Sequence, residues 1–92
     1  MSEHPQTDMT GAGIRNTVID IVARIARIDP EEFEDDVLIR EELGIDSLMA
    51  MEIVAACERR LGISIDEGQV SCVESVGDFL ELVDALYRSQ NG

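Results

Sequence analysis

The sequence predicts an all-α protein, a small four-helix bundle with three long helices, one short helix and a long first loop. Three observations predict this fold. Apolar residues recur at helical spacing in three separate segments, the one short segment that could be a strand has no partner, and 92 residues leave room for a single core. With no Trp, one Tyr and two Phe, that core must be built from Ile, Leu, Val, Ala and Met.

The first long helix is predicted to begin near Ile14 and to end before Pro30. Asp29 lies directly before that proline, a position at which the helical conformation is disfavoured. The apolar residues of this segment are spaced by four, three, four and three positions, which is the pattern of an amphipathic helix. They are Ile14, Val18, Ile21, Ile25 and Ile28.

The predicted domain occupies residues 14–88, between a disordered leader at residues 1–13 and a disordered tail at residues 89–92. Inside the domain, the acidic connection PEEFEDDVLIREELGI joins the first two helices. Long loops in small domains usually pack through their own side chains, and we expect four apolar residues to hold this one against the helices: Phe33, Val37, Leu38 and Leu43.

The remaining helices have clear start and stop signals. The second long helix is predicted at Ser47–Leu61, with Gly62 as its left-handed terminator. One helical turn is expected near Glu67–Cys72. The last helix begins at a capping box formed by Ser75 and Asp78, and its buried stripe consists of Val76, Phe79, Val83 and Leu86.

The second helix has one broad apolar face when it is projected at about 100° per residue. That face contains Ala50, Met51, Ile53, Val54, Cys57 and Leu61. Leu48 and Met49 project on the outer side, near Glu52. Large exposed apolar side chains beside acidic groups indicate a docking surface, and the alternative is that Leu48 folds back under the acidic connection.

The charge of the chain restricts its partners. Twenty acidic and seven basic residues give a net charge of −13, and ten of the acids lie between Asp29 and Glu52 with one base, Arg40. This surface repels nucleic acid and anionic membranes and favours partners with basic patches, although acidity also keeps a small protein in solution. No apolar run approaches the ~18 residues of a membrane span, and no signal peptide is recognisable, so a cytoplasmic protein is expected.

Catalytic and metal sites are not indicated. The sole histidine is His4, so Ser47 has no base, and no G-x-S-x-G elbow surrounds it. The acidic run lacks EF-hand spacing. Cys57 and Cys72 are far apart and lack CxxC spacing, so a zinc site has no ligands. Two free thiols in a reducing compartment are expected, and a disulfide between them is the alternative that their spacing allows. The sequence therefore predicts a protein that is not an enzyme.

The segment LGIDSLMAMEI, Leu43–Ile53, closely resembles the L-G-x-D-S-L motif of the acyl carrier protein family, which has a glutamate five residues after the serine, here Glu52. The resemblance extends from about Ile14 to Leu86. It includes the acidic connection, the LGISI that follows the second helix and the VESVGDFLELV that begins the last one. It implies a carrier with a 4′-phosphopantetheine arm attached covalently to Ser47.

The resemblance also implies how such a site is used. A phosphopantetheinyl transferase adds the arm from coenzyme A with Mg²⁺, which Asp46 helps to place, and Asp46 or Ser47 is also a favoured helix N-cap. The arm then carries acyl thioesters between acyltransferases, ketosynthases or ligases in polyketide, fatty acid or related specialised biosynthesis. Basic patches of these partners would dock on Leu48, Met49, Met51, Glu52, Glu41 and Glu42. A freestanding monomer without nucleic-acid or membrane partners is expected, and a carrier domain cut from a multidomain synthase is the alternative.

Two departures from the family pattern favour a dedicated carrier over a housekeeping one. Met49 follows D-S-L where fatty acid carriers usually have an acid, and Gly68 and Cys72 interrupt the short third helix. Two other functions stay open. A peptidyl or aminoacyl carrier is disfavoured because Ile45 stands where such proteins have glycine, and an acidic helical adaptor would use Ser47 only as a helix cap.

Overall fold

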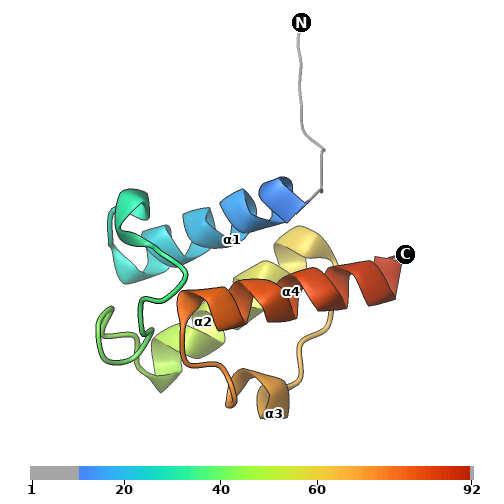
Figure 1. Ribbon diagram of the computed structural model, residues 1–92. Coiled ribbons are helices and arrows are strands. Elements are labelled where there is room, and N and C mark those ends of the chain that lie inside the picture. Colours follow the sequence, from blue (N-terminus) through green and yellow to red (C-terminus); the bar gives the residue numbers. More distant parts are fainter. Residues whose placement is uncertain (1–10, 92) are drawn as a thin grey trace, which may run out of the picture.

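The structure, a computed structural model, describes residues 11–91 of the chain (Figure 1). Along the chain these form α1 (Gly11–Ala26), the 3₁₀ turn η1 (Pro30–Glu32), α2 (Ser47–Leu61), α3 (Glu67–Val70) and α4 (Val76–Asn91). α1 contacts both α2 and α4, and Figure 1 shows it running in the opposite direction to both. The predicted all-α bundle, with three long helices, one short helix and a long first loop, is confirmed.

α1 ends several residues before the proline that was predicted to end it. Arg27 adopts the left-handed conformation, with φ of 60°. The N–H of Ile28 then donates to the carbonyl of Ala23 at 3.0 Å, which is the hydrogen bond of a Schellman helix end. Pro30 therefore begins the separate turn η1 instead of ending α1.

The N-terminal boundary also differs from the prediction. α1 begins at Gly11, so residues 11–13, which were assigned to the leader, are helical. Carbonyls in the first turn of a helix accept N–H groups from the second turn. Burial of Ile14 in the core fixes the start of the helix, so the residues before it can be helical as well. The rest of the predicted leader, residues 1–10, lies outside the described residues.

The predicted tail is helical as far as Asn91. The side chain of Gln90 bridges to the loop after α2, where it accepts the N–H of Ser64 at 2.8 Å and donates to the Ser64 carbonyl at 3.0 Å. This pair of hydrogen bonds holds the last turn of α4, so residues 89–91 belong to the domain. Gly92 lies outside the described residues.

The core draws residues from every long helix, from the acidic connection before α2 and from the loop after α2. Its buried members are Ile14, Val18, Ile21, Val22, Ala23, Phe33, Ile45, Ile53, Cys57, Leu61, Ile63, Ile65, Val76, Phe79, Leu80 and Val83. Leu86, predicted in the buried stripe of α4, is only partly buried, and Leu80 joins the core instead.

The acidic connection is fixed to the start of α4 and to α1. The N–H groups of Val76 and Gly77 donate to the carbonyls of Val37 and Asp35 at 2.9 and 2.8 Å. The carboxylate of Asp35 also pairs with Arg15 of α1 at 2.7 Å. A Cβ at Gly77 would lie 2.9 Å from the Asp35 carbonyl oxygen, so the close approach of the two segments requires glycine there.

The predicted helix signals around α3 and α4 are largely confirmed. Ser75 Oγ accepts the N–H of Asp78 at 3.1 Å, and the Asp78 carboxylate accepts the N–H groups of Glu74 and Ser75 at 3.1 and 3.2 Å. These backbone hydrogen bonds, first that of Glu74 and then that of Ser75, lower the pKa of Asp78. Gly68 does not interrupt α3 but lies inside it, and Cys72 follows the helix.

Candidate functional site

Ser47 is the first residue of α2, at the end of the bundle where the acidic connection meets the helix (Figure 1). Asp46 is the N-cap, and its carboxylate accepts the N–H of Met49 at 2.9 Å. The Ser47 side chain is exposed, and its hydroxyl forms no hydrogen bond within the part of the chain that the structure describes. The interpretation of Ser47 as the helix cap is therefore wrong, because Asp46 has that role.

The start of α2 favours a negative group on the Ser47 oxygen. α2 has 15 residues and ends as predicted, with Gly62 left-handed at φ 66°. Its N-terminus carries the positive end of the helix dipole. Among residues 11–91 the N–H groups of Ser47 and Leu48 have no acceptor, and unpaired N–H groups of this kind bind phosphate.

The outer face of α2 beside Ser47 is apolar and exposed. Leu48 is 69% exposed and Met51 is 59% exposed, so Leu48 does not fold back under the connection. Met49 is half-buried against the core because it lies one helical turn before the buried Ile53. The predictions that Met49 is exposed and that Met51 belongs to the buried face are both wrong; Met51 lies with Leu48 and the exposed Glu52.

The acids predicted for docking lie on two elements. Glu52 is on α2, whereas Glu41 and Glu42 are exposed on the connection that leads into it. The Glu42 carboxylate accepts the N–H of Leu38 at 2.7 Å and so closes a turn of this connection. Glu42 therefore has a structural role that its sequence position did not indicate.

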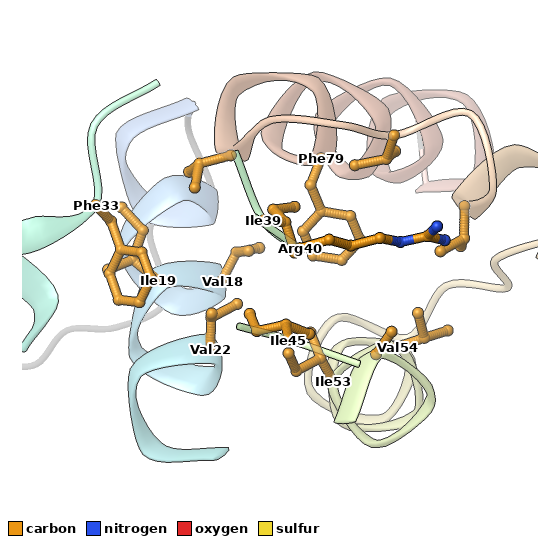
Figure 2. Close-up of a pocket in the computed structure, with 14 residues that line it drawn as sticks. Val18, Ile19, Val22, Phe33, Ile39, Arg40, Ile45, Ile53, Val54 and Phe79 are labelled. Atoms are coloured by element: carbon orange, nitrogen blue, oxygen red, sulfur yellow. The ribbon is translucent and has the colours of Figure 1, made fainter. Parts of the chain in front are cut away.

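The bundle contains a pocket that was not predicted, and its lining includes residues close to Ser47 in the sequence. Its volume is about 60 Å³, and it lies between α1, α2, α4 and the connection (Figure 2). Ile45, two residues before Ser47, and Ala50, three residues after it, both line this pocket. The other walls are mainly valine and isoleucine side chains, with Phe33 and Phe79. Apart from Arg40, which also lines the pocket, these residue types are the same in a filled core, so the sequence carries no signal for the hollow between them.

Both cysteines are free thiols, as predicted. Cys57 is buried inside α2, and this burial raises the pKa of its thiol to about 12, so it stays protonated and unreactive near neutral pH. Cys72 is exposed. Within residues 11–91, no three His, Cys, Asp or Glu side chains are placed to hold a metal ion. No helix in that range is long and apolar enough to cross a membrane.

Comparison with known proteins gives a family match that includes this site. The profile of the family described as "Phosphopantetheine attachment site" matches residues 16–83. The chain is 34% identical over 62 residues to an acyl carrier protein of Saccharopolyspora erythraea, covering 67% of this chain and 65% of that one. It is 30% identical over 79 residues to the polyketide-8 synthase acyl carrier protein 2 of Streptomyces avermitilis, covering 86% of this chain and 90% of that one.

One similar protein is much longer. The chain is 35% identical over 68 residues to the non-reducing polyketide synthase Dhc5 of Alternaria cinerariae. The aligned residues cover 74% of this chain. The chain spans only 3% of the length of that synthase. The similarity to Dhc5 therefore concerns a single small segment of it.

Proposed function

This chain belongs to the phosphopantetheine attachment site family, among its acyl carrier proteins, and on that premise we propose that Ser47 bears the 4′-phosphopantetheine arm. The thiol of the arm holds acyl groups as thioesters and presents them to other enzymes in turn. The observation that carries the proposal is the exposed Ser47 hydroxyl, which is left without a hydrogen bond in the described chain because Asp46 caps α2. The protein is a carrier on which enzymes act and is not itself an enzyme.

The attachment reaction requires an accessible hydroxyl and yields an anionic ester. In the proposed step, the Ser47 oxygen attacks the pantetheine phosphate of coenzyme A, its proton is lost and 3′,5′-ADP leaves. The resulting phosphodiester lies at the start of α2, where the unpaired N–H groups of Ser47 and Leu48 stabilise its charge. We propose that Asp46, besides capping the helix, helps a phosphopantetheinyl transferase to place Mg²⁺.

Partners are proposed to dock on the surface around Ser47. Leu48 and Met51 supply exposed apolar contacts, and the exposed Glu52 and Glu41 supply charge for basic patches on the partner. Met49 and Glu42 belong to the edge of this docking surface, since Met49 is half-buried and the Glu42 carboxylate already accepts the N–H of Leu38. Acyltransferases, ketosynthases and ligases are the proposed partner classes.

A polyketide pathway is proposed over fatty acid synthesis. Two of the similar proteins are named as a polyketide synthase and a polyketide synthase carrier. In addition, Met49 takes the place after D-S-L that is usually acidic in fatty acid carriers. A cytoplasmic monomer is part of the proposal, and its free cysteines suit a reducing compartment.

The test is covalent loading. The purified 92-residue chain is incubated with coenzyme A, Mg²⁺ and a broad-specificity phosphopantetheinyl transferase, and its intact mass is measured. The wild type and Ser89→Ala, which changes an exposed serine on α4, should each gain one phosphopantetheine, and Ser47→Ala should gain none. A folded wild type that stays unmodified, or a Ser47→Ala variant that is modified, would refute the proposal and favour an acidic adaptor.

A further inference from the structure

Arg40 is the only charged side chain among the 14 residues that line the pocket between α1, α2, α4 and the connection. Figure 2 shows this side chain extended across the pocket, with its guanidinium on the side of Val54. Arginine buries its aliphatic stem on apolar surface while its charged end stays accessible. Arg40 thus brings a fork of hydrogen-bond donors to a pocket whose other walls are apolar.

Within the described residues, the Arg40 guanidinium has no partner in the protein. Arg40 forms no ion pair or hydrogen bond with any residue between 11 and 91. It also lines a neighbouring hollow of about 270 Å³ together with Glu41 and Glu74, and it pairs with neither carboxylate. The other arginines that pair in this range do so at surface positions: Arg15 with Asp35, Arg24 with Asp20 and Arg88 with Asp84.

The size of the pocket limits what enters it. A cavity of ~150 Å³ holds one benzene ring, whereas this pocket measures about 60 Å³. It accepts a few carbon atoms and not a ring or a long chain. Ile45 and Ala50 line it and flank Ser47 in sequence, so a short group on a Ser47 arm can reach it when the arm folds back along α2.

We propose that Arg40 selects an acyl group with an oxygen on its third carbon, as in a 3-oxoacyl or malonyl thioester. This inference rests on the proposed carrier function of Ser47. The first carbons of the cargo fill the apolar pocket, and the Arg40 guanidinium donates to the oxygen. A saturated acyl group of equal length has no acceptor there, so it gains no hydrogen bond from the guanidinium, which water solvates because Arg40 is exposed. A carboxylate is bound by two parallel hydrogen bonds, and a keto oxygen accepts one.

The experiment compares cargos of similar length that differ in the oxygen atoms on the third carbon. The full chain is loaded with acetoacetyl, malonyl or butyryl pantetheine from the matching coenzyme A thioesters, and loading is checked by intact mass. Amide chemical shifts of Ile53 and Val54, measured against the unacylated holo form, report the ratio of pocket-bound to free cargo. That ratio should be about tenfold higher for acetoacetyl or malonyl than for butyryl, because one charge-assisted hydrogen bond favours the pocket-bound form by about that factor. The two oxygenated cargos distinguish a keto oxygen from a carboxylate.

Matched variants assign the preference to the guanidinium. Arg40→Leu keeps an apolar stem and should give all three cargos the same ratio, and Arg40→Lys should retain part of the preference. Arg59→Leu makes the same charge change at the exposed far end of α2 and should behave as wild type. Circular dichroism confirms that each variant is folded.

Two results would overturn the inference. One is an equal ratio for the three cargos in the wild type, and the other is a preference that survives Arg40→Leu. Failure of the wild type to accept any pantetheine, which the intact mass detects before any spectrum is recorded, would instead overturn the carrier function of Ser47. The two failures are therefore distinguishable.

Discussion

Replacing Asp46 by alanine removes the acceptor at the start of α2. The Asp46 carboxylate accepts the N–H of Met49 at 2.9 Å, and that N–H lies in the first helical turn, where no carbonyl of the helix can reach it. Loss of an N-cap Asp costs about 1 kcal/mol of unfolding free energy. For a domain of this size, that cost lowers Tm by about 4–8 °C.

Asparagine at the same position is the matched control. Its amide oxygen accepts the same hydrogen bond, and Asn caps helices about as well as Asp, so Asp46→Asn should stay within about 0.5 kcal/mol of the wild type. Asn lacks the carboxylate that the proposed Mg²⁺ role requires. The rate of phosphopantetheine transfer should therefore fall about tenfold or more in both variants, although only Asp46→Ala is destabilised.

Thermal unfolding followed by circular dichroism measures the first effect, and the time course of the mass increase measures the second. If Asp46→Asn lost as much stability as Asp46→Ala, or if Asp46→Ala lost none, the capping argument would be refuted. A normal transfer rate in Asp46→Asn would contradict the Mg²⁺ role and leave the capping role intact.

Three further predictions concern packing, thiol reactivity and pH. Replacing a glycine inside a helix by alanine usually raises the free energy of unfolding by about 1 kcal/mol. At Gly77, however, the alanine Cβ would lie 2.9 Å from the Asp35 carbonyl oxygen. Urea denaturation of Gly77→Ala should show a free energy of unfolding lower by about 1–3 kcal/mol. Gly68→Ala, whose Cβ would have its nearest contact at 3.8 Å, should be neutral or stabilising. Equal effects of the two substitutions would contradict the clash. Because burial raises the pKa of Cys57 to about 12, a thiol reagent at neutral pH should modify Cys72 only, and equal rates at both cysteines would disprove this. The folded state keeps a proton that an unfolded cysteine loses above about pH 8.5, so stability should fall as pH rises from about 8.5 towards 12, and Cys57→Ala should flatten that fall.

Local signals in the sequence were sufficient for the elements themselves. α2 has the predicted bounds, Ser47–Leu61, because a capping aspartate and a terminating glycine lie at its two ends. The capping box of Ser75 and Asp78 starts α4 as predicted. Such signals act between residues a few positions apart, so they can be read without knowledge of the fold.

The placement of side chains around Ser47 needed the tertiary structure. Helical projection fixes the order of residues around α2 but not the direction in which the helix is turned towards its neighbours. Packing against α1 turns Met49 towards the core and leaves Met51 exposed beside Leu48. An exposed apolar patch beside the start of α2 was therefore predicted, and its members were corrected.

The sequence by itself determined the four helices, the family motif around Ser47 and the acidic surface. Only the tertiary structure decided where α4 ends, because the hydrogen bonds between Gln90 and Ser64 join residues 26 positions apart. It also decided that a hollow remains between the helices and that Arg40 lines it. The physical reason is that helix signals come from neighbouring residues, whereas a pocket is the space that side chains from separate elements leave unfilled when they pack.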